Sequence, residues 1–211
     1  MGRLEAEAAR MGILVDDLLL LARLDQQRPL DQLPVDPEEL VNDSVVAARA
    51  SASGRDIHLS LAPPLPDGAT VLGDPVRLRQ VVDNLLSNAL RYSATDRPIS
   101  VRVGWRRADP GGAGAGPGAT GSTDCVEIEV SDVGDGMSAE VSQRAFERFY
   151  RADGARSREQ GGSGLGLAIV AAIVAAHHGS VGLESQEGIG TSVSVRLPLS
   201  GALIGTAEGQ L

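Results

Sequence analysis

Two asparagines four residues apart are the first side chains of this 211-residue sequence that could do chemistry. Asn84 and Asn88 lie within residues 74–92, whose spacing predicts an amphipathic helix, and they share a polar face with Arg77 and Arg91. Asparagine is a poor helix former, so this pair is unusual on an ordinary solvated face. A carboxamide oxygen suits Mg²⁺ that still carries phosphate ligands, and arginine binds phosphate oxygens. A polar solvent-facing stripe is the alternative that this helix alone leaves open.

An acidic residue follows residues 126–130, where alternating apolar side chains predict a strand. Asp132 ends this strand and is followed by Gly134 and Gly136, which permit a turn that a ligand can approach closely. A buried carboxylate there could accept a hydrogen bond from an exocyclic amine such as that of adenine. The commoner explanation, in which Asp132 only caps a turn, also stays open.

The sequence GGSGLGL, at residues 161–167, is a glycine-rich turn that leads into a predicted helix. Gly162, Gly164 and Gly166 would leave N–H groups and the positive end of the helix dipole free for a phosphate. Such a motif is weak by itself, and the dinucleotide-binding version is disfavoured because a polar loop rather than a strand precedes it. That loop, residues 153–162, could form a lid over a bound nucleotide.

Residues 1–28 predict one long helix, because apolar residues recur along it at alternating steps of three and four, as in the seam of a helix bundle. The seam consists of Leu4, Ala8, Met11, Val15, Leu18 and Ala22, and it is widened by Leu14 and Leu21. Pro29 and Pro34 separate this helix from the rest of the chain. This separation favours a partner helix, with packing on the chain's own domain as the alternative.

The remaining elements that must position the candidate residues follow from caps and periodicity. Asp36-Pro37 and Asp74-Pro75 each place an N-capping aspartate before a proline, which predicts a helix start at both places. Strands are predicted at residues 57–61, 99–105 and 126–130, a helix at 167–176 and a hairpin at 181–197.

This order of elements predicts an α+β fold: a two-layer sandwich in which helices cover one face of a mixed sheet, preceded by one bundle-forming helix. We expect that helix at residues 1–28 and the sandwich at 29–199. Residues 109–124 are rich in Gly, Ala and Pro without apolar periodicity, so they predict a flexible loop between two antiparallel strands. Residues 200–211 predict a loose tail.

Composition excludes several classes of function. All 19 basic residues are arginine, which excludes a Walker-type phosphate loop, a Schiff-base lysine and a Ser–Lys dyad. The net charge of −9 argues against broad nucleic-acid binding. Cys125 is the single cysteine, so an internal disulfide and a cysteine-based zinc site are excluded. No apolar run reaches the roughly 18 residues of a membrane helix, and we expect a soluble chain in a reducing compartment.

Taken together, these segments resemble the sensor histidine kinases of bacterial two-component systems. The matching boxes are residues 74–92 (N box), 132–136 (first glycine box), 146–151 (F box), 162–170 (second glycine box) and 188–191 (last glycine box). Their order and spacing make the resemblance specific. Residues 10–25 are also similar to the second helix of the family's dimerisation hairpin.

The resemblance implies the Bergerat ATP-binding sandwich, with ATP and Mg²⁺ as ligands. Asn88 would ligate Mg²⁺, Asn84 would support the metal or a phosphate, and Asp132 would recognise the adenine amino group. Further ATP-binding residues implied by the resemblance are Arg91, Tyr92, Gly134, Gly136, Gly162, Gly164, Leu165, Gly166 and Thr191, with Arg148 and Arg151 as phosphate contacts. Phe146 and Phe149 would instead pack the lid against its base.

The sequence departs from the family pattern in four places, one of them Ser180, where the family often has a second glycine after His-Gly. Arg91 stands where the family usually has lysine, and Val133 replaces the commoner Asn or Thr of the first glycine box. The family phosphorylates a histidine in a His-Glu/Asp-x-x-Thr/Ser-Pro context, and no such segment occurs here. His177 and His178 end a predicted helix, where the dipole favours histidine, so we expect no phosphoacceptor in this chain.

The function implied by the resemblance is transfer of the ATP γ-phosphoryl group to a histidine on a dimerisation domain. The expected partners are that histidine-bearing domain, a second copy in a homodimer and a downstream response regulator. The implied location is cytoplasmic, including the cytoplasmic part of a membrane-anchored sensor. Two alternatives remain: a protein serine kinase of the anti-sigma-factor type and a non-catalytic nucleotide-binding regulator.

Overall fold

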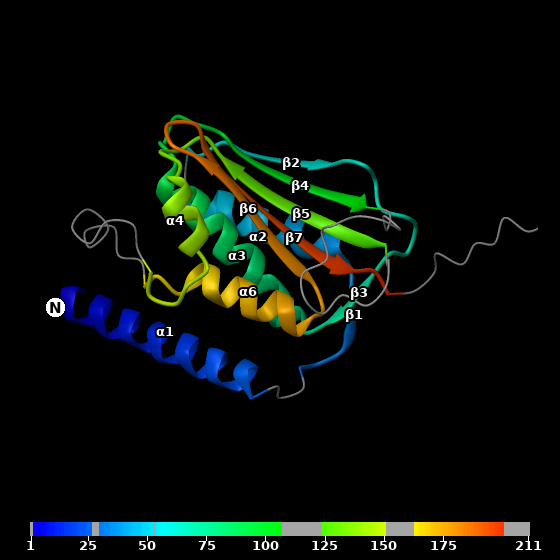
Figure 1. Ribbon diagram of the computed structural model, residues 1–211, viewed down its shortest axis with the longest axis horizontal. Coiled ribbons are helices and arrows are strands. Elements are labelled where there is room, and N and C mark those ends of the chain that lie inside the picture. Colours follow the sequence, from blue (N-terminus) through cyan, green and yellow to red (C-terminus); the bar gives the residue numbers. More distant parts are fainter. Residues whose placement is uncertain (1, 27–29, 53, 107–123, 151–162, 201–211) are drawn as a thin grey trace, which may run out of the picture.

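The computed structural model describes residues 2–26, 30–52, 54–106, 124–150 and 163–200 (Figure 1). The helices are α1 (Gly2–Asp25), α2 (Pro37–Ser51), α3 (Pro75–Tyr92), α4 (Ala139–Arg144) and α6 (Gly166–Ala176). The strands are β1 (Leu33–Val35), β2 (Ile57–Leu61), β3 (Val71–Gly73), β4 (Ile99–Arg106), β5 (Cys125–Asp132), β6 (Ser180–Gln186) and β7 (Gly190–Pro198). Helices α2, α3 and α6 cover one face of the main sheet, which confirms the predicted two-layer arrangement.

The main sheet is mixed, with the strand order β2-β4-β5-β7-β6. Strand β2 runs parallel to β4, and the other neighbours are antiparallel, including the predicted β4–β5 and β6–β7 pairs. In the β5–β7 register, Asp132 lies opposite Thr191. The ends of these two strands therefore bring the first and last glycine boxes side by side.

Aspartate caps start α2 and α3 as predicted. Asp36 Oδ1 accepts the backbone N–H groups of Glu38 and Glu39 at 2.8 and 3.1 Å, and Asp74 Oδ1 caps α3 in the same way. Helix α3 buries one apolar face, formed by Leu78, Val81, Val82, Leu85, Leu86 and Ala89. The core thus fixes which face of α3 remains available to a ligand.

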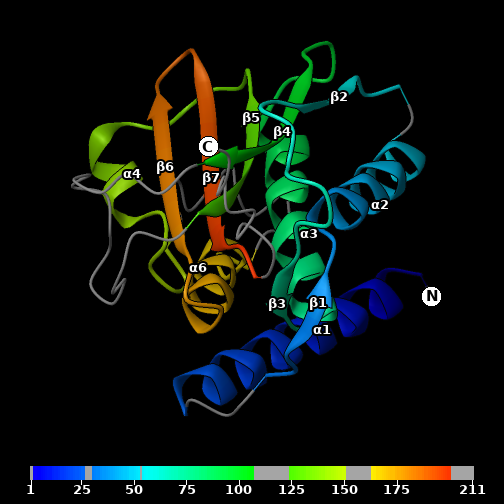
Figure 2. The same cartoon turned by 90° about the vertical axis from the view of Figure 1, so that its right-hand side faces the viewer.

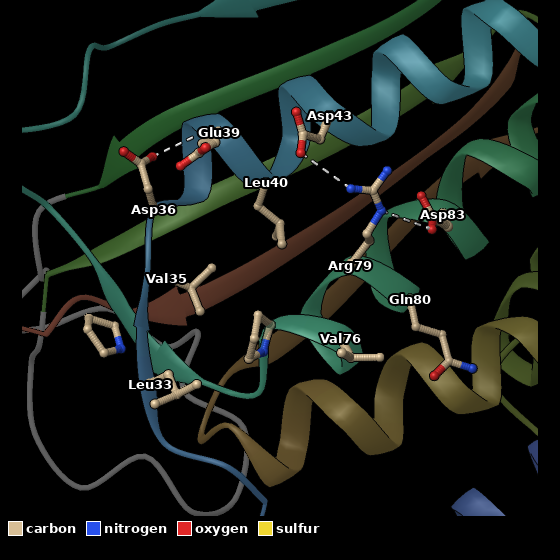
Figure 3. Close-up of a pocket in the computed structure, with 12 residues that line it drawn as sticks. Leu33, Val35, Asp36, Glu39, Leu40, Asp43, Val76, Arg79, Gln80 and Asp83 are labelled. Carbon is tan, nitrogen blue, oxygen red and sulfur yellow. Dashed lines mark hydrogen bonds and ion pairs between the residues drawn. The ribbon is translucent and has the colours of Figure 1, made fainter.

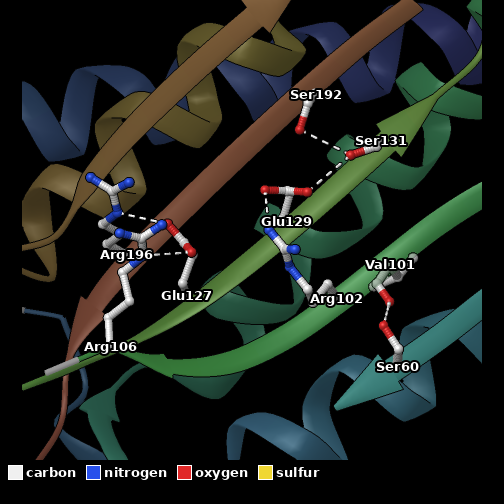
Figure 4. A network of polar contacts seen from close by, with 9 residues as sticks. All are labelled: Ser60, Val101, Arg102, Arg106, Glu127, Glu129, Ser131, Ser192 and Arg196. Atoms are coloured by element: carbon white, nitrogen blue, oxygen red, sulfur yellow. Dashed lines mark hydrogen bonds and ion pairs between the residues drawn. The ribbon is translucent and has the colours of Figure 1, made fainter. Parts of the chain in front are cut away.

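The opposite face of the sheet is polar and is stabilised by ion pairs (Figure 4). Both carboxylate oxygens of Glu127 are bound, by Arg106 Nε at 2.7 Å and by Arg196 Nε at 2.8 Å. Arg102 binds Glu129 at 2.8 Å beside this cluster. The sheet therefore needs an apolar layer on its helix side alone, where Val101, Val126, Ile128, Val130 and Val195 are buried.

Helix α1 packs beside α6 on the outside of the helix layer (Figure 2). Leu20 and Leu21 are buried, whereas Met11, Val15 and Leu18 of the predicted seam are 61 %, 55 % and 42 % exposed. Leu21, which was expected to widen the seam, packs on the core instead, as does Leu20. No helix in the described part of the chain is long and apolar enough to cross a bilayer.

Three short elements were not predicted. Strands β1 and β3 form a separate antiparallel pair, and three residues each are too few to produce a periodic signal. Helix α4 is a short helix capped by Ser138, whose Oγ accepts the N–H of Val141. Of the predicted loop at residues 109–124, only Asp124 is described; the loop at 153–162 and most of the tail, residues 201–211, also lie outside the described residues.

Candidate nucleotide site

Helices α3 and α6 bring two separately predicted motifs together. Asn84 Nδ2 donates to the carbonyl of Gly166 at 3.5 Å. A Cβ atom on Gly166 would lie 3.8 Å from Asn88 Nδ2 and 3.9 Å from Asn84 Oδ1. The asparagine pair therefore faces the first residue of α6, and both amides are only half-buried. Helix α6 follows Leu165, whose apolar side chain cannot cap it, so its first N–H groups are suited to an anion.

Asp132 supplies a buried acceptor at the end of β5. Its Oδ1 atom is buried and has no hydrogen-bond partner among the described residues. Burial raises the pKa of Asp132, and the backbone N–H groups of Gly134 and Thr191 and the charge of Arg55 oppose this shift. A buried carboxylate oxygen without a partner is costly unless a ligand binds it, so this atom fits the amino group of adenine.

The turn after Asp132 can only be built with glycine. Gly134 forms a bridge with Ser93, and a Cβ on it would lie 2.3 Å from the carbonyl oxygen of Tyr92 and 2.7 Å from Asp132 Oδ1. Gly136 has a φ of +64°, and a Cβ on it would lie 1.9 Å from the carbonyl oxygen of Gln186. Side chains at either position would displace the strands around Asp132.

The other predicted nucleotide residues lie in different surroundings. Arg91 is half-buried at the end of α3, and Tyr92 is 50 % exposed. Gly164 has a φ of +70°, which favours glycine, and its carbonyl accepts the N–H of Phe149 at 3.0 Å. The side chain of Leu165 is fully buried in the core, so only its backbone could meet a ligand. Arg151 and Gly162 lie outside the described residues.

Two F-box residues make contacts that the sequence did not predict. Arg148, expected near phosphate, binds Asp25 at the end of α1 at 2.7 Å, and this hydrogen bond raises the pKa of Arg148. Phe149 is 58 % exposed, and the loop that it was expected to pack lies outside the described residues, so that role stays a prediction. The backbone of Phe149 has a φ of +63°, and its N–H donates to the carbonyl oxygen of Gly164.

His177 and His58 are both engaged in contacts within the fold. His177 is 2 % exposed; its Nε2 accepts the N–H of Asp74 at 3.0 Å, and its Nδ1 donates to the carbonyl of Ile173 at 2.8 Å. These contacts require the neutral ring and leave neither nitrogen free. His58 is exposed and pairs with Asp56 at 2.9 Å.

A comparison with protein families identifies the domain that contains these residues. Residues 73–201 match the family described as "Histidine kinase-, DNA gyrase B-, and HSP90-like ATPase". The chain belongs to this ATPase family. The match covers the N box, the glycine boxes and the whole main sheet except β2.

Similar proteins narrow the relationship. The chain is 41 % identical over 201 residues to a probable sensor histidine kinase, TcrY, of Mycobacterium tuberculosis, covering 95 % of this chain and 38 % of that protein. It is 36 % identical to the signal transduction histidine-protein kinase BaeS of Escherichia coli, covering 93 % and 38 %. The chain thus spans less than half the length of these curated relatives.

Solved structures confirm the predicted Bergerat sandwich. The mycobacterial sensor histidine kinase MprB aligns with a TM-score of 0.61 and 28 % identity, over 80 % of this chain and 97 % of that chain. Full-length ShkA in complex with AMPPNP aligns with a TM-score of 0.69 and 30 % identity, over 93 % of this chain and 37 % of that one. The chain therefore contains an ATP-binding catalytic domain of the sensor histidine kinase type.

A hollow of about 680 Å³ lies between β1 and the starts of α2 and α3 (Figure 3). Its polar rim carries Asp36, Glu39, Asp43, Arg79 and Asp83. The single arginine is already paired with two of these carboxylates, at 3.5 and 3.8 Å. An ATPase of this family must hold a polyphosphate, and this acidic rim would repel one. The hollow is therefore distinct from the nucleotide site.

Sequence analysis missed one residue beside the site. Arg55 precedes β2, outside every box, yet its charge acts on Asp132 and its guanidinium binds the end of α3. The flanking residues Gly54 and Asp56 gave no periodicity or motif that could have identified it.

Proposed function

We propose that this domain binds ATP with Mg²⁺ and transfers the γ-phosphoryl group to a histidine on a partner helix hairpin. The observation that carries the proposal is the pairing of two unsatisfied polar features across one site. Asp132 offers a buried acceptor without a partner, and Asn84 and Asn88 face the uncapped start of α6. The first suits an adenine amine, and the second suits phosphates and their metal.

Each residue would have a distinct role. Asp132 would accept the adenine amino group, while Gly134 and Gly136 keep the turn open to the base. Asn88, supported by Asn84, would hold Mg²⁺, which supplies neutralisation of the phosphate charge when bound. The first N–H groups of α6 and the guanidinium of Arg91 would bind phosphate oxygens.

Such a site acts by positioning rather than by covalent chemistry of its own. In the transfer, the bond from the γ-phosphorus to the bridging oxygen breaks and a bond to the acceptor nitrogen forms, so ADP leaves. We expect the acceptor to come from another segment. His177 uses both ring nitrogens, His58 is paired on the surface, and the exposed His178 follows α6 outside the sequence context in which the family phosphorylates a histidine.

Helix α1 would present this domain to its substrate. Met11, Val15 and Leu18 form an exposed apolar stripe, and one helix cannot bury such a stripe by itself. We propose that the stripe packs against the other helix of a dimerisation hairpin, within a homodimer that passes phosphate to a response regulator.

The proposal is tested with γ-labelled ATP and a separately produced helix hairpin that carries an acceptor histidine. The chain alone should bind ATP and remain unlabelled, whereas the added hairpin should become labelled. Asn88→Ala should lower Mg²⁺-dependent ATP affinity and transfer, whereas Ser87→Ala, an exposed neighbour on the same helix, should change neither. Leu18→Asp should reduce transfer and leave ATP affinity intact.

The nature of the label separates the alternatives. Phosphohistidine is acid-labile, so an acid-stable label would instead support a serine kinase of the anti-sigma-factor type. ATP binding without transfer to any supplied hairpin would support a non-catalytic regulator. Strong labelling of His58, His177 or His178 would contradict the expectation that this chain lacks its own acceptor.

A further inference from the structure

Arg55 connects the loop before β2 to the end of α3. Its Nη1 atom donates to the carbonyl oxygens of Ser93, at 3.3 Å, and of Ala94, and its Nη2 donates to Ser93 Oγ. A cation at a helix C-terminus is favoured by the helix dipole and by the unpaired carbonyls there. Arg55 is separated from these residues by about 40 positions, so this cap depends on the tertiary fold.

The end of α3 is where the two halves of the nucleotide site meet. Ser93 is 7 % exposed, its Oγ donates to the carbonyl of Ala89 at 2.7 Å, and its backbone forms the bridge with Gly134. On one side of this junction, α3 carries Asn88; on the other, the turn follows Asp132. A shift of Ser93 would change the distance between the base acceptor and the asparagine pair.

Arg55 also acts on Asp132 electrostatically. Its positive charge lowers the pKa of Asp132 against the upward effect of burial. Its Nε atom is buried and without a hydrogen-bond partner in the described part of the chain, so the guanidinium is partly removed from water. Its charge is therefore screened less than that of a surface arginine.

We propose that Arg55 is a positioning residue of the adenine site, which fixes the end of α3 against the Gly134 turn and so holds Asp132 in place as an acceptor for the base. This inference rests on the proposed role of Asp132 in base recognition. Arg55 would touch no ligand atom itself. Its effect on ATP binding must then pass through Asp132, which a purely structural residue would not require.

The test is a double-mutant cycle measured by calorimetric titration with ATP. Arg55→Met should raise the Kd for ATP about tenfold in the parent chain, and by less than about twofold in the Asp132→Asn background. Arg55→Lys keeps the charge and should recover part of the affinity, and it provides a readout if Arg55→Met folds poorly. Arg97→Met removes an exposed arginine from the loop after α3 and should leave the Kd unchanged.

The outcomes are separable. Equal losses of affinity from Arg55→Met in both backgrounds would overturn the proposal, because Arg55 would then support the fold alone. Unchanged affinity in Arg55→Met, alongside a loss in Asp132→Asn, would also overturn it while leaving the adenine site intact. Unchanged affinity in Asp132→Asn would overturn the adenine assignment itself, and the role of Arg55 with it.

Discussion

Strand β5 carries carboxylates on both faces of the sheet, and two of them, Glu127 and Asp132, have opposite surroundings. Glu127 lies on the open face, is 7 % exposed, and has an arginine on each oxygen. Asp132 ends the strand on the helix side, and its buried Oδ1 has no partner among the described residues. Burial raises the pKa of both groups; for Glu127, the hydrogen bonds from Arg106 and Arg196 outweigh burial and lower it.

The difference separates a structural carboxylate from one that is kept for a ligand. A buried charge stabilises a fold only when its hydrogen-bonding capacity is filled, as it is at Glu127. An unfilled acceptor such as Asp132 Oδ1 costs stability in the free protein. Such a group is expected where binding of a ligand recovers that cost. Asp132 lies within residues 73–201, which match an ATPase family, so ATP is the ligand that we expect there.

The largest expected effect is on ATP affinity in Asp132→Asn. The amide places a donor or a weaker acceptor where the adenine amine needs a carboxylate, so the Kd for ATP should rise about 30- to 100-fold. Thermal stability should hold or increase, because burial disfavours the charged carboxylate that the neutral amide replaces. Calorimetric titration and thermal denaturation check both quantities, and equal ATP and GTP affinity in the parent chain would contradict the base assignment.

Glu127→Gln should have the opposite effects, lowering stability and leaving ATP affinity intact. Losing two charge-assisted hydrogen bonds should lower the free energy of unfolding by about 2 kcal/mol, while the Kd for ATP stays unchanged. Glu129→Gln is the matched control: Glu129 pairs with one exposed arginine, and its loss should cost about 0.5 kcal/mol. Urea denaturation measures these values. A fall in ATP affinity in Glu127→Gln would show that the two faces are coupled.

The sequence predicted the layers of the fold because core and caps are local signals. The capping residues Asp36 and Asp74 predicted the starts of two helices, and alternating Val and Ile residues predicted β4, β5 and the final hairpin. The β1–β3 pair was not predicted, because each strand has only three residues and is ordered by pairing with the other strand rather than by its own sequence pattern.

The candidate site was predicted residue by residue but not as an arrangement. Asn84, Asn88 and Gly166 were each identified by type and spacing, and only the packing of α3 against α6 brings them together. Arg55 and the Arg148–Asp25 pair could not be predicted, since each joins segments distant in sequence. The burial of part of helix α1 also could not be predicted, because it depends on packing against α6, which is distant in sequence.

Lowering the pH should protonate Asp132 before Glu127, because their pKa values are shifted in opposite directions. The pKa of Glu127 lies below its ordinary 4.5, so its stabilising contribution is complete above pH 4.5 and is lost as pH falls through the lowered value. The pKa of Asp132 lies above its ordinary 3.8, so its ionised form disfavours the folded state, and this cost disappears as pH falls through the raised value.

Binding of ATP needs the ionised Asp132, so affinity should fall first, by about tenfold per pH unit below the raised pKa, while the domain is still folded. Because ATP itself titrates, Asp132→Asn provides the background, and its affinity should follow ATP alone. Calorimetric Kd values and the free energy of unfolding from pH 7 to pH 3 measure the two windows. Loss of fold and of affinity at one pH would argue against the distinction.

The smallest expected effect tests the phosphate half of the site without touching either carboxylate. In Gly166→Ala the new methyl group would meet both asparagine amides at ordinary contact distances of 3.8 to 3.9 Å, so thermal stability should not fall. The same methyl would occupy the space between the amides and the start of α6, where phosphate and metal are expected. The Kd for ATP with Mg²⁺ should therefore rise about fivefold, whereas that for adenosine should not change. Gly12→Ala in α1, with nothing within 4 Å of the added atom, is the matched control. Equal losses for ATP and adenosine would place the effect at the base, because only a phosphate contact can make the methyl group discriminate between the two ligands.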